Sequence, residues 1–335
     1  MAHSIPAIQS TVYYRLIALW AVCEAFAGGL LHAFKVPFTG MVINSLSVIC
    51  IVLIAKHHRA RLAILQATVI VAVFKMMLSP HSPPTAYIAL FFQGLLGQVL
   101  FATGRVWLLS SILLATLTLV ESSIQRILVL VIVYGNEFWQ AVDVFITKLT
   151  GRTLVDSYSF QIAALYVLIH AITGVFVGSY AFHLSHSIQD TFIRLKPYLM
   201  QQQADIHGEV TAPQKKKKRW LLMIVWGILL LIFLQSIVQP EHAILASMDV
   251  VKIILRAALI LLSWYLFLLP LVKRWMHHLL NKQKARMAHQ IAIVQSLIPE
   301  MKQLFVHSWK VSADKGGLKR IRLFMQVLLI NLLYE

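Results

Sequence analysis

Residues 160–182 read FQIAALYVLIHAITGVFVGSYAF and contain no Asp, Glu, Lys or Arg. A hydrophobic stretch of about 18 residues or more is long enough to cross the hydrocarbon core of a bilayer, which is about 30 Å thick. Within that core a segment must satisfy its own backbone hydrogen bonds, and an α-helix does so. The stretch therefore predicts a transmembrane helix, and similar stretches occur along the whole chain.

The overall composition is also typical of an integral membrane protein. Of the 335 residues 59% are hydrophobic and only 13% are charged, and the mean hydropathy is +0.75. A soluble globular protein is typically about 45–50% apolar and about a quarter charged. The charged residues are too few to cover a water-facing surface of this size. We therefore predict an all-α fold, a polytopic transmembrane helical bundle.

Eight spans are expected, separated by polar, basic or proline-containing connections. They are residues 12–34, 39–55, 62–78, 86–102, 106–134, 160–182, 220–238 and 250–272. The fifth span is long and contains the polar sequence ESSIQR at 121–126. We expect it to be one tilted helix, because two crossings would place the next basic connection on the opposite side of the membrane.

The formal net charge of +17 lies mainly in the connections and in the C-terminal tail. In an eight-span topology the basic segments 56–61, Arg105, 194–219 and the tail after residue 273 fall on the same side as the N-terminus. Lys and Arg are enriched in cytoplasmic segments of membrane proteins. We therefore expect both termini in the cytoplasm, in a bacterial plasma (inner) membrane. The basic segments would face anionic lipid and not nucleic acid.

The spans predict two membrane modules joined by a basic linker. Residues 1–190 contain the first six spans, residues 191–219 form the linker, and residues 220–335 contain the last two spans and the tail. Residues 282–304 and 317–332 alternate basic and apolar side chains at helical spacing. They are expected to form cytoplasmic amphipathic helices of the kind that lie on an anionic membrane.

The first span contains small residues at helical spacing, which are Ala18, Ala21, Ala25, Gly28 and Gly29. Small side chains on one helix face allow another helix to approach closely. Packing within the bundle is the simpler explanation of this feature taken by itself.

Residues 18–55, ALWAVCEAFAGGLLHAFKVPFTGMVINSLSVICIVLIA, resemble the substrate-binding S components of energy-coupling-factor (ECF) vitamin transporters. Those are six-span proteins whose first helix docks on a transmembrane T component through an AxxxA pattern, which Ala21 and Ala25 match here. Residues 74–98, FKMMLSPHSPPTAYIALFFQGLLGQ, are also similar. The resemblance implies that residues 1–190 bind a small vitamin-like or cofactor-precursor solute from outside.

Residues 297–334, LIPEMKQLFVHSWKVSADKGGLKRIRLFMQVLLINLLY, resemble the cytoplasmic coupling region of the T component of the same transporters. In that family a helix that begins near a proline leads to an Ala-Arg-Gly motif, a glycine-containing turn and a basic amphipathic helix. Pro299 and Gly316-Gly317 occur in this order, but the Ala-Arg-Gly motif is absent, since residues 308–311 read SWKV.

Together the two resemblances imply an S-like domain fused to a shortened T-like domain. The chain would then be a membrane subunit of an ECF-like importer that couples to ABC-type ATPase subunits, or to these and a separate T component. The residues implied in coupling are Ala21, Ala25, Lys310, Lys319, Arg320 and Arg322. The alternative is a non-transporting membrane scaffold, in which the small-residue face and the basic tail serve assembly only.

Polar residues of the fifth span are the first candidates for binding the solute. An ionisable group within the hydrocarbon depth is costly and is a functional candidate for that reason. Glu121 and Gln125 are four residues apart and share a helix face, and Arg126 is close enough to neutralise Glu121 partly. These residues lie toward the outer side, where an S component takes its substrate. A structural ion pair that ties helices together explains them equally well.

Further candidates are Lys75 at the outer end of the third span, Gln93 in the fourth span and Asn136 after the fifth. Lys75 is also able to extend its ammonium to the interface, and Gln93 to form a hydrogen bond between helices. Asn136 belongs to a polar stretch that would cover a pocket opening outward. Glu24 lies near the middle of the first span, beside its small-residue face.

The sequence predicts neither catalysis nor a cofactor or metal. It has no Gly-rich phosphate loop, nucleophile elbow or HExxH motif, so an ATPase would be a separate chain. The adjacent pairs His57-His58 and His277-His278 point about 100° apart on a helix and are poorly placed to chelate together. Cys23 and Cys50 lie in apolar segments without CxxC spacing and are expected to be small buried side chains.

Overall fold

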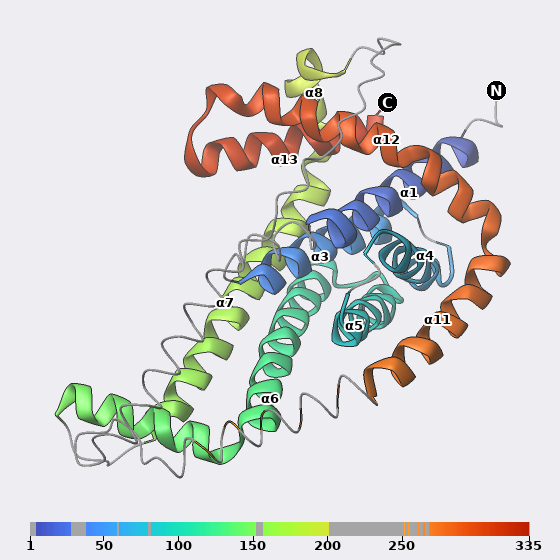
Figure 1. Ribbon diagram of the computed structural model, residues 1–335. Helices are drawn as coiled ribbons and strands as arrows, with labels where there is room; N and C mark the ends of the chain where they lie inside the picture. Colours follow the sequence, from blue (N-terminus) through green and yellow to red (C-terminus); the bar gives the residue numbers. More distant parts are fainter. Residues whose placement is uncertain are drawn as a thin grey trace. The chain divides into compact units, whose positions relative to one another are not determined.

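The computed structural model describes residues 5–27, 38–58, 60–79, 82–151, 157–200 and 269–334, with isolated positions between 251 and 268. In this described part the chain forms helices and no strands (Figure 1). The predicted seventh span, most of the eighth, the end of the first and the basic run at 215–219 lie outside the described residues.

The described residues fall into two units. The first comprises those within 1–125, 166–201 and 269–335, and the second those within 126–165 and 202–268. The C-terminal tail therefore belongs to the same unit as the first helices of the chain.

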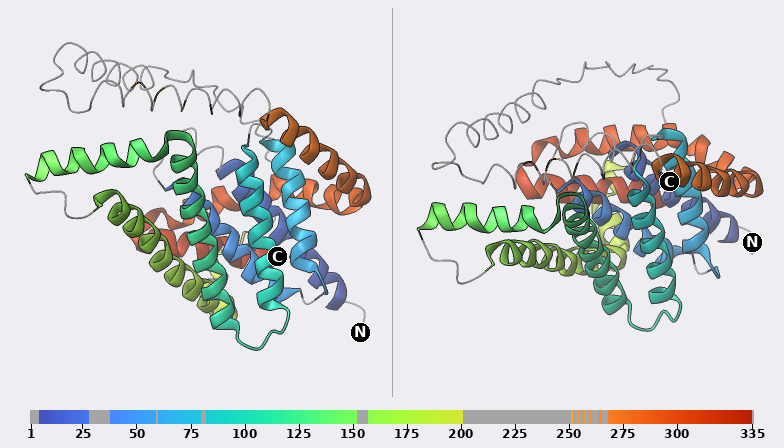
Figure 2. Two further views of the ribbon diagram at one scale, coloured as in Figure 1. Left: turned by 90° about the horizontal axis from the view of Figure 1, so that it is seen from below. Right: turned by 60° about the horizontal axis from the view of Figure 1, so that its bottom comes forward.

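Four apolar helices form the N-terminal part of the first unit. They are α1 (Ile5–Val22), which continues as the π-helix η1 (Cys23–Ala27), α3 (Thr39–His57), α4 (Ala63–Leu78) and α5 (Pro84–Phe101). Helix α1 packs against α3 and α4, and α5 packs against α3 and α4. Figure 2 shows α4 and α5 side by side after a short connection.

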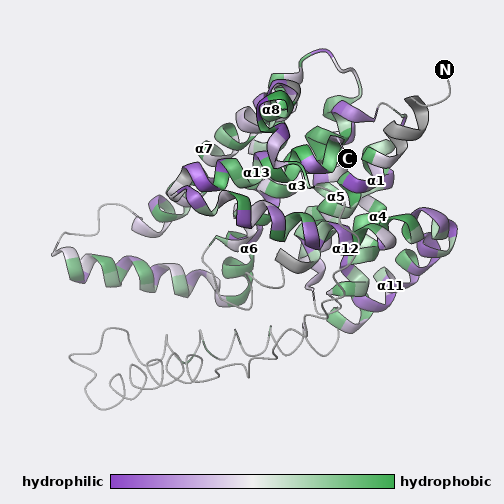
Figure 3. Ribbon diagram, turned by 90° about the horizontal axis from the view of Figure 1, so that it is seen from above, coloured by the Kyte–Doolittle hydropathy of each residue, from purple (hydrophilic) through white to green (hydrophobic). Residues whose placement is uncertain are grey.

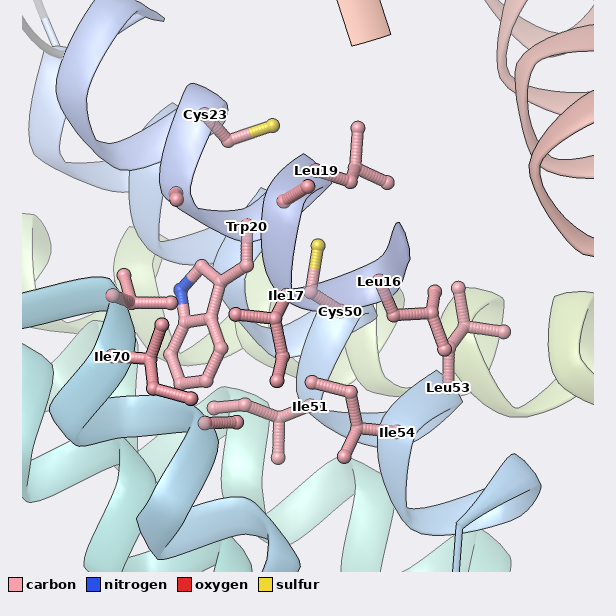
Figure 4. Close-up of a cluster of buried hydrophobic side chains, with 14 of the residues drawn as sticks. Leu16, Ile17, Leu19, Trp20, Cys23, Cys50, Ile51, Leu53, Ile54 and Ile70 are labelled. Atoms are coloured by element: carbon pink, nitrogen blue, oxygen red, sulfur yellow. The ribbon is translucent and has the colours of Figure 1, made fainter. Parts of the chain in front are cut away.

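The centre of this bundle is apolar on all sides of its helices, which is typical of helices that are surrounded by other elements. The side chain of Trp20 is fully buried, and Figure 4 shows those of Ile17, Ile51 and Ile70, from α1, α3 and α4, beside its ring. The boundaries predicted for the second and fourth spans, 39–55 and 86–102, agree with α3 and α5 to within two residues.

Helices α6 (Trp107–Thr150) and α7 (Tyr158–His186) follow. Helix α6 runs without interruption through residues 121–126, so the prediction of one continuous helix there is confirmed. After Gly135, where φ is 76°, the helix resumes and continues to Thr150. The sequence predicts a polar connection there, and the difference arises because glycine accepts the positive φ of a kink without ending the helix.

Two glycines of α7 allow a close approach to α6 within the first unit. A Cβ built at Gly174 would lie 2.4 Å from the Cα of Thr116, and one at Gly178 would lie 2.5 Å from the Cα of Ile112. The pair forms a GxxxG pattern, in which the missing side chains let two helix backbones touch.

In the described part four helices are long and apolar enough to cross a membrane, namely Thr39–His57, Pro84–Phe101, Trp107–Asn136 and Tyr158–His186. Helix α4 is a shorter apolar helix. Exposed Leu, Ile, Val and Phe side chains are numerous on α6 and α7, as expected where helices face lipid. These features are those of a membrane protein.

The other helices of the first unit are more polar. They are α8 (Ile188–Leu195), η2 (Lys196–Tyr198), α11 (Leu269–Arg286), α12 (Ala288–Val311), η5 (Ser312–Asp314) and α13 (Gly317–Tyr334). Hydrophilic and hydrophobic residues alternate along α11, α12 and α13 (Figure 3). The amphipathic character predicted for the tail is therefore present.

The boundaries of the first tail helix differ from those predicted. The predicted helix 282–304 is divided at Met287, and α12 runs through Pro299 instead of beginning near it. A proline inside a helix costs a hydrogen bond and about 3 kcal/mol. Burial on both sides of Pro299, at Val294 and Met301, offsets that cost.

The tail packs directly on the first helix. Helix α12 lies against α1 (Figure 1), and Nη2 of Arg15 is 3.0 Å from Oε1 of Glu300. Asn331 of α13 accepts a hydrogen bond from the backbone N–H of Met200 at 2.7 Å. The tail thereby contacts both α1 and the segment that follows η2.

We expect Gly178→Val to destabilise the protein, because its Cβ would collide with the backbone of α6. Overpacking typically costs about 1–3 kcal/mol. Heating in detergent followed by size-exclusion chromatography should show a lower unfolding midpoint than for the wild type. Gly316→Val is the control, since nothing lies within 4 Å of a Cβ there. Equal midpoints for the two variants would contradict the close packing.

Candidate functional site

A buried ion pair lies inside the N-terminal helices of the first unit. Nζ of Lys75 on α4 donates to Oε2 of Glu24 on η1 at 2.6 Å. Both side chains are buried, with Lys75 7% and Glu24 4% exposed. Glu24 lies on a π-helical turn, and such turns occur frequently at functional sites.

The pair has further polar partners on the neighbouring helices. The hydroxyl of Ser47 on α3 donates to Oε1 of Glu24 at 2.6 Å. Nζ of Lys75 is also 3.5 Å from the carbonyl oxygen of Ala86 and 5.8 Å from the centroid of the Tyr87 ring, both on α5. Each element of the bundle thus contributes a group to the site.

A second hydrogen bond between helices involves Asn44, which lies one helical turn before Ser47 on α3. Nε2 of Gln93 on α5 donates to Oδ1 of Asn44 at 2.9 Å, and Gln93 is fully buried. Oε1 of Gln93 has no hydrogen-bond partner among the described residues. Asn44 is three residues from Ser47 and shares its helix face. The polar residues therefore form one group, which we call the Glu24 cluster: Glu24, Asn44, Ser47, Lys75 and Gln93.

The Glu24 cluster is formally neutral, because one carboxylate faces one ammonium. Removing two charges from water is costly, and the mutual attraction compensates only when geometry and additional hydrogen bonds are good. Ser47 supplies such a bond to Glu24. Chemically, the cluster offers a strong acceptor, a strong donor and a buried amide oxygen within one apolar bundle.

Two of the sequence-predicted site residues, Lys75 and Gln93, belong to this cluster. The roles of Glu24, Asn44 and Ser47 as their partners were not predicted from the sequence. The sequence did contain a signal for the Glu24–Lys75 pair, namely an acidic residue in the first expected span and a basic residue in the third. An unpaired charge is unfavourable in hydrocarbon, so ionisable side chains in membrane segments usually pair with one another.

The other predicted solute-binding residues lie elsewhere. Nε2 of Gln125 donates to Oε1 of Glu121, which is the contact expected on a shared helix face. Arg126 is exposed and forms no ion pair among the described residues. Arg126 and Asn136 belong to the second unit, and Asn136 is exposed. There Asp143 accepts hydrogen bonds from the backbone N–H and hydroxyl of Ser159.

The predicted coupling residues fall into two groups. Ala21 and Ala25 are buried, 0% and 4% exposed, inside the first unit. Their helix is therefore packed against this chain's own helices. The docking role of the AxxxA pattern remains a prediction.

The predicted basic residues of the tail gather where α12 turns into α13. We call this surface the hairpin tip: Trp309, Lys310, Lys319, Arg320, Ile321 and Arg322. The guanidinium carbon of Arg320 lies 4.0 Å from the centroid of the Trp309 ring, a cation–π contact. Trp309 is 54% exposed and Ile321 58% exposed. The tip thus presents basic and apolar groups together.

No family model, curated protein or solved structure was found to match the chain. The described residues contain no group of three or more His, Cys, Asp or Glu side chains placed to hold a metal ion.

We expect Glu24→Gln and Lys75→Met each to destabilise the protein strongly, because each leaves one buried charge unpaired. Breaking a buried ion pair in this way typically costs about 3–5 kcal/mol. The double variant E24Q/K75M removes both charges and should recover most of the loss. The measurement is a double-mutant cycle of thermal unfolding midpoints in detergent.

The control is Glu300→Gln, which removes the ion pair that Glu300 forms with Arg15. Its side chains are 12% and 26% exposed, and pairs nearer the surface contribute about 1 kcal/mol or less. Additive single-variant effects at Glu24 and Lys75 would show that the two residues do not form a coupled pair.

Proposed function

We propose that this chain is a membrane subunit of an ECF-like importer. Its helical bundle binds a small vitamin-like or cofactor-precursor solute from outside, and its tail couples to cytoplasmic ABC-type ATPases. The observation that carries the proposal is the Glu24 cluster. A charged pair inside an apolar bundle is costly, and buried ionisable groups of membrane proteins mark solute or ion pathways.

The packing of the tail on α1 supports the coupling part of the proposal. Helix α12 contacts the same helix that carries the small residues and leads into Glu24. A movement of α12 at the cytoplasmic face is therefore transmitted to the helix next to the site. In the ECF resemblance the corresponding contact joins two separate chains, and here it would be internal.

The chemistry of the hairpin tip supports an acidic protein surface as its partner. Lys310, Lys319 and Arg322 are exposed, and the apolar faces of Trp309 and Ile321 lie among them. Basic side chains around exposed aromatic and aliphatic groups suit an acidic protein surface with an apolar centre. Anionic lipid is the other surface with this chemistry.

A non-transporting scaffold is the alternative. It is favoured by the complete pairing of Glu24 with Lys75 and Ser47. It is also favoured by the burial of Ala21 and Ala25 within this chain. A scaffold has no need of ATPases, so their association separates the two functions.

We expect ABC-type ATPase subunits, identified by mass spectrometry, to co-purify with the full chain from its native membrane. The charge-reversal variant K310E/K319E/R322E should retain about tenfold less ATPase, because like charges placed together cost several kcal/mol. Lys282 and Lys284 are exposed on α11, and K282E/K284E is the matched control. Absence of ATPases from the wild-type preparation would favour the scaffold. Equal retention by both variants would exclude the tip as the docking surface.

The topology gives a separate prediction. We expect Ser157→Cys to react with a membrane-impermeant maleimide in intact cells, and Ala313→Cys to react only after the membrane is opened. Both positions are exposed, whereas the native Cys23 and Cys50 are buried at 4% and 2% exposure. The reverse pattern would place the tail outside the cell and contradict coupling to cytoplasmic ATPases.

A further inference from the structure

We propose that the Glu24 cluster binds a zwitterionic solute, one that carries an ammonium and a carboxylate and has no net charge. The ammonium would replace Lys75 as the partner of Glu24, and Lys75 would take the carboxylate. This inference rests on the proposed function and names the class of solute that the importer takes.

The neutrality of the cluster excludes most singly charged solutes. Glu24 and Lys75 cancel each other, and no other charged side chain contacts them among the described residues. An anion or a cation entering this apolar bundle would add an uncompensated charge, which is strongly unfavourable in a low dielectric. A zwitterion adds no net charge and replaces one ion pair by two.

The groups of the cluster match the two ends of such a molecule. Oε1 and Oε2 of Glu24 accept hydrogen bonds, as an ammonium requires. Nζ of Lys75 has three N–H donors, and its contact with the Ala86 carbonyl is long, at 3.5 Å. A carboxylate would be a stronger acceptor than that carbonyl.

The unpartnered oxygen of Gln93 is a second, independent indication of a ligand. It belongs to a fully buried side chain whose amide nitrogen is already bound to Asn44. Buried polar atoms without a partner are rare and costly in folded proteins. An N–H or O–H of the solute would satisfy this oxygen.

The position of the pair in the bundle fits entry from outside. Lys75 lies in the last turn of α4, and Ala86 lies in the first turn of α5. The pair is therefore near the connection at 79–83, which the expected topology places on the outer side. Glu24 reaches this level on η1, where a π-helical turn alters the register of the helix.

The test is to purify the full chain in detergent from native membranes and to identify the small molecules that denaturation releases. We expect wild type and the control E300Q to release the same compound, bearing one basic and one acidic group. E24Q and K75M should each release at least about tenfold less. The double variant E24Q/K75M keeps the site neutral and is expected to fold, so its loss of the compound reports on binding and not on folding.

A released compound with only one of the two charges would overturn the inference, as would equal amounts from wild type and E24Q/K75M. Release of no compound from wild type would also overturn it. The importer proposal is decided separately, by the ATPases that co-purify with the same wild-type preparation. A preparation that contains ATPases and a singly charged compound would support the importer proposal and contradict the inference of a zwitterionic solute.

Discussion

The ion pair between Glu24 and Lys75 is the constraint on which the arrangement of the N-terminal helices depends. Two opposite charges are stable inside an apolar bundle only while they remain in contact, and their 2.6 Å separation fixes η1 against α4. Ser47 on α3 joins the same carboxylate. The apolar residues around Trp20 set how tightly these helices pack, whereas the polar contacts set which faces meet and in what register.

Helix α1 is enclosed by helices from two distant parts of the chain. It packs against α3 and α4 of the bundle and against α12 of the tail. Its residues Leu16 to Ala21 are buried throughout. Small side chains at Ala18 and Ala21 keep the helix narrow enough to be enclosed in this way. The pattern that resembles an intermolecular docking face is thus used within the chain.

The sequence predicted those elements whose limits depend on local chemistry. Spans 39–55 and 86–102 end at basic or proline-containing connections, and the observed helices agree. It did not predict the continuation of α6 beyond Gly135, because a glycine in a polar stretch is equally compatible with a turn. Nor did it predict the pairing of Glu24 with Lys75, which are 51 residues apart. Such contacts depend on which helix faces meet, and hydropathy along the chain does not contain that information.

Two ion pairs among the described residues of the first unit are connected by one short length of helix. Arg15 contacts Glu300 of the tail, and Glu24 contacts Lys75 of the bundle. At about 1.5 Å per residue, the two positions are about 14 Å apart along the helix axis. A helix of this length moves nearly as a rigid body, because its backbone is closed by hydrogen bonds and its side chains are packed on all sides. In the proposed importer, a displacement of α12 would therefore shift Glu24 relative to Lys75, and separation of that pair would expose a carboxylate and an ammonium to the solute. Binding and coupling, as proposed, would then act on the same helix, because α1 and its continuation η1 carry both Arg15 and Glu24.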